Sequence, residues 1–165
     1  VDRPMIVKLA PNVPDIGRIG AAVVDAGADA ICAINTMPGM VIDPESGQPV
    51  LSNRVGGVSG AALRPIAVHA VYQVRAVVDV PIIGTGGVES VEDAVEMLSA
   101  GATAVGVGSA VYTHGPEVFG SLRDGLVEWL DQRAMNLADV RGRAHEVPGW
   151  PEHASTHPVP AGHTG

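Results

Sequence analysis

Short apolar stretches and longer amphipathic segments alternate along this chain. Each apolar stretch has the length of a β-strand, and the segment behind it repeats apolar residues at helical spacing. The predicted strands are residues 5–10, 28–35, 81–84 and 103–107. The predicted helices are residues 15–26, 63–78, 90–100 and 116–133. Asp15 opens the first of them and Gly27 follows its end as the C′ residue, and Ser90 is the predicted N-cap of the third. Successive strand–helix units predict a parallel sheet, and the continuously apolar strands predict burial on both faces of that sheet.

Two of the predicted strands lead into glycine-rich turns. Gly84-Thr-Gly-Gly-Val88 follows the third strand, and Gly106-Val-Gly-Ser-Ala110 follows the fourth. Glycine lets backbone N–H groups approach a phosphate, and the helix N-terminus behind the turn favours negative charge. In a (β/α)₈ barrel the phosphate site follows strands seven and eight, and a whole barrel takes about 250 residues. We therefore predict an α/β fold in which residues 1–146 form the C-terminal half of a TIM (β/α)₈ barrel, strands five to eight with their helices.

A small doubly wound sheet is the alternative architecture, and it would need no second half. Neither glycine turn has the GxGxxG order, and no acidic residue ends a strand where it would bind a ribose. Residues 147–165 contain four prolines and three glycines without periodicity, and we predict that this tail is disordered. The tail histidines and the nearby His145 are predicted to be solvated.

Composition narrows the classes of function. The chain has 165 residues, with 18 acidic and 10 basic side chains and a net charge of −8. This balance argues against a nucleic-acid partner. No apolar run approaches the roughly 20 residues of a membrane-spanning helix, and the start of the chain does not resemble a signal peptide. The single cysteine, Cys32, excludes an intrachain disulfide and a multi-cysteine zinc site, so we predict a cytoplasmic protein without a metal.

Polar residues on otherwise apolar strands are the candidates for chemistry. Lys8, the only lysine, alternates with Ile6 and Ala10, which predicts an ammonium in the barrel interior or at its mouth, or a strand-end lysine that reaches solvent. Asn35 and Thr36 end the second predicted strand, where a TIM barrel keeps its catalytic groups. An Asn amide can match the edge of an imide or pyrimidine ring, or it can simply turn the chain.

Other polar or flexible segments have simpler interpretations. The loop Gly56-Gly-Val-Ser-Gly60 lies at the same end of the predicted barrel as Asn35, and residues 41–51 read as a hairpin excursion that could form a lid. We interpret Cys32 as a small buried hydrophobe. The acidic residues of the third predicted helix, Glu92, Asp93 and Glu96, are most simply surface charges.

Five motifs in order resemble the C-terminal half of dihydroorotate dehydrogenase, most closely the class 1B catalytic subunit. The resemblance covers residues 1 to about 143. The motifs are Val7-Lys-Leu-Ala-Pro-Asn12, Ile34-Asn-Thr36, Gly56-Gly-Val-Ser-Gly-Ala61 with Arg64-Pro65, Ile83-Gly-Thr-Gly-Gly-Val88 and Gly106-Val-Gly-Ser109.

The resemblance implies FMN-dependent oxidation of dihydroorotate to orotate in the de novo pyrimidine pathway to UMP. It implies that Lys8 contacts the flavin ring, and that Asn35 and Thr36 bind the substrate. Ile34 and Gly60 would line the FMN site, and the phosphate would be held by Gly86, Gly87, Gly108 and Ser109. It further implies a homodimer and a partner subunit with FAD and an iron–sulfur cluster that passes electrons to NAD.

One element of the family pattern is not matched. The general base, a cysteine in class 1B, lies on a loop of the N-terminal half, and Cys32 does not correspond to it. We therefore assign no catalytic residue and expect this chain alone to be inactive. Two alternatives stay open, the FMN domain of a dihydropyrimidine dehydrogenase and a noncatalytic phosphate- or nucleotide-binding half-barrel.

Overall fold

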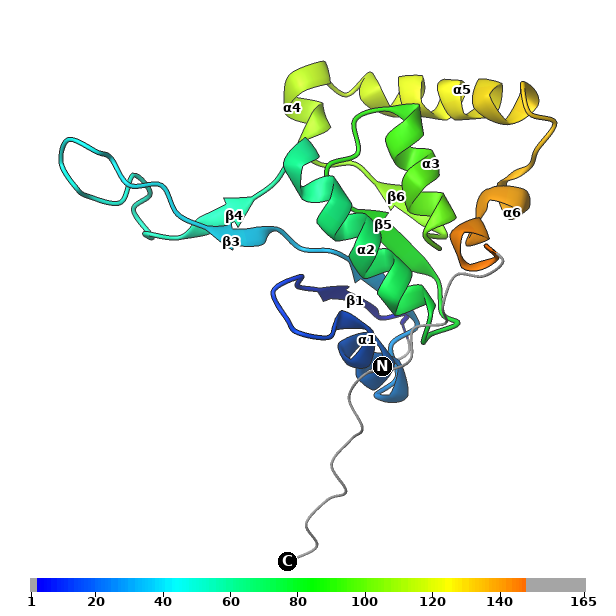
Figure 1. Ribbon diagram of the computed structural model, residues 1–165, viewed down its shortest axis with the longest axis horizontal. Coiled ribbons are helices and arrows are strands. Elements are labelled where there is room, and N and C mark those ends of the chain that lie inside the picture. Colours follow the sequence, from blue (N-terminus) through cyan, green and yellow to red (C-terminus); the bar gives the residue numbers. More distant parts are fainter. Residues whose placement is uncertain (1–2, 148–165) are drawn as a thin grey trace, which may run out of the picture.

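A four-stranded parallel sheet forms the centre of the molecule (Figure 1). The computed structural model describes residues 3–147. The strands are β1 (Ile6–Leu9), β2 (Ala30–Ala33), β5 (Ile82–Thr85) and β6 (Ala104–Gly106). They lie in the order β1-β2-β5-β6, and each pairs in parallel with its neighbour. The spatial order of the strands therefore follows the chain, and β1 and β6 are the edges.

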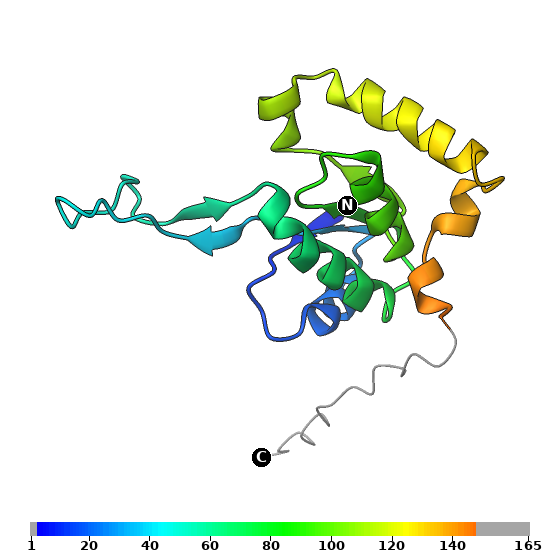
Figure 2. The same cartoon turned by 45° about the horizontal axis from the view of Figure 1, so that its top comes forward.

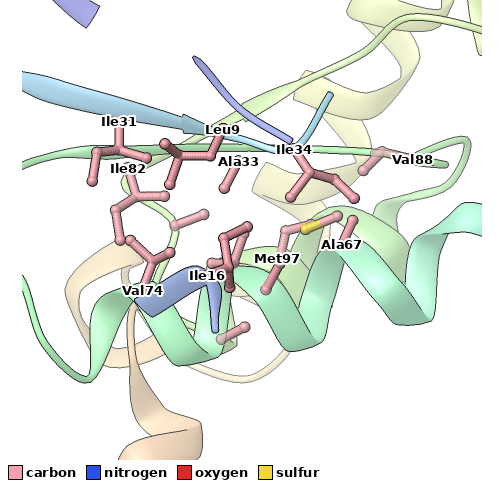
Figure 3. Close-up of a cluster of buried hydrophobic side chains, with 14 of the residues drawn as sticks. Leu9, Ile16, Ile31, Ala33, Ile34, Ala67, Val74, Ile82, Val88 and Met97 are labelled. Carbon is pink, nitrogen blue, oxygen red and sulfur yellow. The ribbon is translucent and has the colours of Figure 1, made fainter. Parts of the chain in front are cut away.

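Three helices cover one face of this sheet. They are α1 (Ile16–Asp25), α2 (Arg64–Arg75) and α3 (Val91–Ser99). Alternate strand residues point toward them and join a single apolar cluster with helix side chains such as Val74 and Met97 (Figure 3). Leu9, Ile31 and Ile82 are the main strand contributions, each at most 4% exposed. This layer of apolar contacts between sheet and helices is the hydrophobic core.

The other face of the sheet is open in the described chain. Ile6 is 54% exposed, and Lys8 is exposed beside it. The prediction of burial on both faces is therefore wrong for this chain alone. The doubly wound alternative is also wrong, because a doubly wound sheet has helices on both faces and a strand order that reverses. Sequential parallel strands with helices on one side are the arrangement of half a (β/α)₈ barrel, as predicted.

The helix ends follow the chemistry expected from the sequence. Asp15 is the N-cap of α1 and accepts a hydrogen bond from the N–H of Arg18, and Gly27, with φ of 101°, follows its C-terminus. Ser90 caps α3 in a capping box with Asp93. The last long helix, α5 (Val118–Asp131), packs against α3 around Val95 and Leu98. These predicted elements are confirmed to within a few residues.

A two-stranded arm leaves the domain between β2 and α2. It contains the antiparallel strands β3 (Met37–Gly39) and β4 (Gly56–Val58) and extends away from the helices (Figures 1 and 2). The predicted hairpin at residues 41–51 is the outer part of this arm. Near its tip, hydrogen bonds from the N–H and hydroxyl of Ser46 lower the pKa of Asp43. The arm does not cover the sheet in this chain, so a role as a lid stays a prediction.

Several short elements were not predicted from the periodicity. They are the 3₁₀ turns η1 (Ala61–Leu63) and η2 (Arg143–His145) and the short helices α4 (Ala110–His114) and α6 (Leu137–Val140). His145 is not simply solvated, because its ring stacks on Tyr72 at 4.0 Å and its Nε2 lies 3.1 Å from the carbonyl oxygen of Ala100. The predicted disordered tail lies outside the described residues, apart from the exposed Val147. No helix in the described part of the chain is long and apolar enough to cross a bilayer.

Candidate functional site

The segment after β2 is joined to both neighbouring strands at their carboxyl ends. The N–H of Ile34 donates to the carbonyl of Thr85 at 3.0 Å, and the N–H of Asn35 donates to the carbonyl of Leu9 at 2.7 Å. Asn35 and Thr36 are exposed and lie just beyond β2 rather than within it. Their position at the carboxyl edge of the sheet is the one predicted, because the carboxyl ends of parallel strands meet there.

Lys8 and Cys32 are neighbours on the open face of the sheet. They are register partners between β1 and β2, and they alternate with the core residues Leu9 and Ala33. Burial raises the pKa of the Cys32 thiol, and the positive charge of Lys8 partly opposes this rise. The thiol is therefore mostly protonated at neutral pH, which does not favour a reactive nucleophile. Cys32 is only partly buried, so the prediction of a buried residue is wrong for this chain.

The loop before α2 meets the turn after β5. A Cβ atom added to Gly87 would lie 2.6 Å from the carbonyl oxygen of Gly60 and 3.0 Å from the backbone nitrogen of Arg64. Gly60 and Gly87 have φ values of 92° and 70°, a region that glycine enters far more readily than other residues. The two glycines therefore form one close backbone contact between segments that are distant in sequence.

The flanking glycines extend this contact on both sides. A Cβ on Gly86 would lie 2.6 Å from the Cβ of Ala67, and a Cβ on Gly57 would overlap the side chain of Thr36. Ile34, only 3% exposed, lies in the core next to Gly86 rather than on an open surface. The structure thus links Thr36, the Gly56–Gly60 segment and the Gly86–Gly87 turn.

The second glycine turn follows the adjacent strand. Thr85 pairs with Gly106, so the turns after β5 and β6 leave the same edge of the sheet. A Cβ on Gly108 would meet only open space, and Ser109 directly precedes α4. Within residues 3–147, the N–H groups of Gly87 and Gly108 donate no hydrogen bond to another residue. Gly87 is buried, and a buried unpaired N–H is costly unless an acceptor is supplied.

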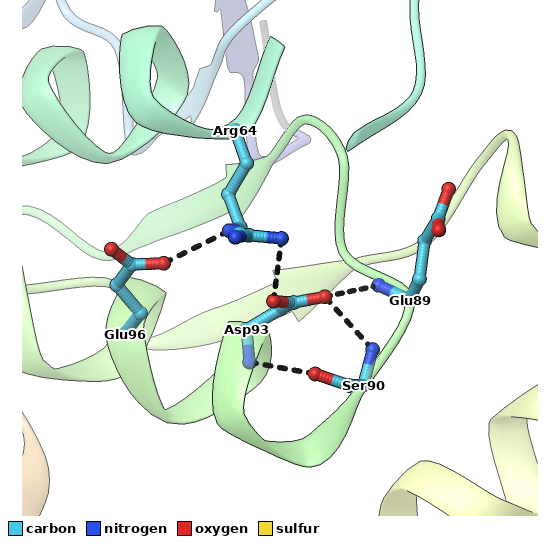
Figure 4. A network of polar contacts seen from close by, with 5 residues as sticks. All are labelled: Arg64, Glu89, Ser90, Asp93 and Glu96. Atoms are coloured by element: carbon cyan, nitrogen blue, oxygen red, sulfur yellow. Dashed lines mark hydrogen bonds and ion pairs between the residues drawn. The ribbon is translucent and has the colours of Figure 1, made fainter. Parts of the chain in front are cut away.

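Arg64 links the start of α2 to the start of α3 (Figure 4). Its guanidinium lies 2.7 Å from Asp93 and 3.0 Å from Glu96. Asp93, only 8% exposed, also accepts the N–H groups of Glu89 and Ser90. The interpretation of Asp93 as a plain surface charge is therefore wrong. The Arg64-Pro65 pair had pointed to a motif, but no spacing in the sequence indicated these partners.

The charged side chains of the described chain are not arranged to hold a metal. Among residues 3–147, no group of three or more His, Cys, Asp or Glu side chains lies close enough for one ion. The candidate site instead combines free backbone N–H groups, one lysine and the Asn35 amide. Such a set can bind a phosphate and a flat polar ring.

Comparisons with known proteins agree with this geometry. The sequence model of the family described as dihydroorotate dehydrogenase matches residues 1–130. The chain belongs to this family. It is 50% identical over 148 residues to the dihydroorotate dehydrogenase B (NAD(+)) catalytic subunit of Methanosarcina mazei, covering 89% of this chain and 47% of that protein. For the Pyrococcus horikoshii subunit of the same name the identity is 46% over 147 residues, with coverage of 88% and 48%.

A solved structure gives the same result for the fold. The crystal structure of DHODH from Eimeria tenella in complex with ferulenol matches with a TM-score of 0.70 and 30% identity, covering 88% of this chain and 39% of that one. All predicted site residues, from Lys8 to Ser109, lie inside the stretch that the dihydroorotate dehydrogenase family model matches. The chain spans about half the length of the curated relatives it matches.

The placement of Lys8 beside Cys32 on the open face of the sheet can be tested directly. Since Lys8 lowers and burial raises the pKa of Cys32, the variant Lys8→Met should raise that pKa further. At pH 8 less thiolate is then present, so iodoacetamide should modify Cys32 more slowly than in the parent chain, with mass spectrometry as the readout. Arg18→Met, at an exposed residue of α1, is the matched control. An equal or faster reaction in Lys8→Met would show that the ammonium does not lie beside the thiol.

Proposed function

We propose that this chain supplies half of an FMN-binding barrel that oxidises dihydroorotate to orotate in pyrimidine biosynthesis. The observation that carries the proposal is the position of two glycine turns and Asn35 at the carboxyl edge of one parallel sheet whose open face carries Lys8. The curated relatives with this part of the sequence are named as catalytic subunits of dihydroorotate dehydrogenase B. This name favours dihydroorotate as the substrate over the two alternatives, a dihydropyrimidine dehydrogenase domain and a noncatalytic half-barrel.

The residues present fit the phosphate end of FMN. Gly87 and Gly108 have free N–H groups, and the space beside Gly108 would be filled by any side chain. Together with Gly86 and Ser109 they would hold the phosphate, while the close backbone contact with Gly60 would fix the Gly86–Gly87 turn. The exposed ammonium of Lys8 on the open face fits the polar edge of the flavin ring. Ile34 would contribute mainly through its backbone, because its side chain lies in the core.

Each residue has a definite task in the proposed reaction. Bound FMN would supply a ring that accepts a hydride from the substrate. Lys8 would stabilise the negative charge that develops on the ring edge nearest to it. The Asn35 amide and the Thr36 hydroxyl would donate to and accept from the substrate's ring edge and so fix its orientation. The proton lost from the substrate needs a base, which we place in the half of the barrel that this chain does not match.

The partners follow from the same proposal. A catalytic subunit whose relatives are named for NAD(+) would pass its electrons to a second subunit, for which we propose FAD and an iron–sulfur cluster. A homodimer of catalytic subunits and a cytoplasmic location also stay predictions.

The test uses a protein in which the barrel is complete. This chain is fused to, or co-expressed with, the part of the Methanosarcina mazei relative that it does not match, and the product is called the assembled protein. We expect it to retain FMN, visible in its absorbance, and to reduce the flavin when dihydroorotate is added. The chain alone should do neither. An assembled, folded protein that stays colourless after incubation with FMN would contradict the proposal.

A further inference from the structure

Arg64 occupies a central place between the two segments that build the proposed phosphate site. Its backbone nitrogen lies against Gly87, and the loop that ends at Gly60 runs directly into it through η1. Its guanidinium reaches across to α3, the helix that follows the Gly86–Gly87 turn. Arg64 therefore contacts the Gly86–Gly87 turn through its backbone and helix α3 through its guanidinium.

Asp93 completes the connection from the other side. Its Oδ2 accepts the N–H of Glu89 at 3.0 Å and the N–H of Ser90 at 2.9 Å, and its Oδ1 lies 2.7 Å from Arg64 (Figure 4). The backbone between Gly87 and Ser90 is thus held at one end by the close packing of Gly87 on the Gly60 loop and at the other by Asp93. A buried carboxylate with these partners has little freedom to move.

The positive charge of Arg64 is already compensated by neighbouring carboxylates. Two carboxylates, Asp93 and Glu96, lie within salt-bridge distance of the guanidinium, so the three side chains together carry a negative charge. Such a cluster does not attract a phosphate by itself. Any effect of Arg64 on phosphate binding must therefore come from where it holds the backbone.

We infer that Arg64 is a positioning residue for the phosphate of the flavin. Through Asp93 it fixes the Gly86–Gly87 turn against Gly60, so that the free N–H of Gly87 is held in place to receive the phosphate. This inference rests on the proposed function. It assigns to Arg64 and Asp93 a role in cofactor affinity and none in the chemical step.

The test compares two ligands that differ only in the phosphate. FMN and riboflavin are titrated into the apo form of the assembled protein by flavin fluorescence, for the parent and for Arg64→Gln and Asp93→Asn. Both variants should bind FMN about tenfold or more weakly, as is usual when an orienting contact is lost, while riboflavin affinity is little changed. The matched controls, Arg123→Gln and Asp124→Asn, alter an exposed ion pair on α5 and should leave both affinities unchanged.

The sign of the Asp93→Asn effect is decisive. Asparagine keeps the shape of the side chain and an oxygen for the two N–H groups, but it removes a negative charge near the phosphate site. If charge alone mattered, this variant would bind FMN more tightly, whereas loss of positioning weakens binding. Tighter binding in Asp93→Asn would overturn the inference, as would equal weakening of FMN and riboflavin or no change in either.

A milder variant keeps the inference testable if Arg64→Gln does not fold. Arg64→Lys keeps the charge but lacks the planar fork that spans both carboxylates, so its FMN affinity should fall between those of the parent and Arg64→Gln. Affinity equal to that of the parent would show that spanning both carboxylates is not needed and would contradict the role given to the guanidinium. Failure of the proposed function gives a different result, because the parent itself would then bind no flavin, or would bind FMN and riboflavin equally well.

Discussion

The variant Gly108→Val should abolish FMN retention by the assembled protein while its fold stays native. A Cβ added to Gly108 meets no atom of the described residues within 4 Å, and Gly108 is not among the glycines with positive φ, so neither overlap at the Cβ position nor backbone strain is expected. The space it fills is the one through which the N–H of Gly108 would reach the phosphate. Flavin absorbance after gel filtration measures retention, and circular dichroism with a thermal melt measures the fold.

The matched control for this variant is another glycine with open surroundings. A Cβ on Gly120, in α5, also meets nothing within 4 Å. Gly120→Val should therefore keep its FMN, apart from a small helix-propensity effect on stability. If Gly108→Val retains FMN as tightly as the control does, the phosphate is bound elsewhere and the proposed site is wrong.

Gly87 should behave differently from Gly108, although the two belong to similar turns. At φ of 70°, a side chain costs about 1–2 kcal/mol of backbone strain, and the new Cβ would also lie 2.6 Å from the carbonyl oxygen of Gly60. Gly87→Val is therefore expected to lose stability as well as FMN. Urea unfolding separates the two effects, because only Gly87→Val should lower the midpoint strongly.

The sequence predicted the features that depend on nearby residues. The caps at Asp15 and Ser90, the glycine after α1 and the strand–helix order all follow from local patterns, and each was found within a few residues of its predicted place. The carboxyl-edge position of Asn35 also followed, because parallel strands bring their ends together. Local patterns of this kind act over a few residues and can be read without knowing the rest of the fold.

Contacts between distant segments could not be predicted in this way. Arg64 and Asp93 are far apart in sequence. The spacing of Ser90 and Asp93 is that of a capping box, but it does not show that Arg64 pairs with Asp93. The same limit applies to Ile34, whose apolar character fits both a core and a cofactor site. The exposure of Ile6 was missed for another reason: its strand reads as buried on both faces, yet only the helix-facing side is covered in this chain.

Lys8→Ala should slow the reduction of bound flavin by dihydroorotate about 100-fold, since a single well-placed donor to a developing charge commonly contributes this much or more. Lys8 is exposed on the open face and forms no ion pair within the described residues, so its loss should leave the stability of the fold nearly unchanged. Stopped-flow absorbance in the assembled protein follows the reductive step directly. The Arg18→Ala variant removes an equal charge from the outer surface of α1 and should reduce its flavin at the parent rate.

The Lys8→Ala variant distinguishes an effect on FMN retention from an effect on the rate of flavin reduction. The proposed phosphate contacts at Gly87 and Gly108 follow strands that are distant in the sheet order from β1. Lys8→Ala should therefore still retain most of its FMN, and the loss should fall on the rate of reduction. Lys8→Arg keeps a positive charge but replaces the compact ammonium by a larger planar group, and should recover only part of that rate. A Lys8→Ala protein that reduces its flavin at the parent rate would place the ammonium away from the ring and return Lys8 to the role of a strand-end lysine in solvent.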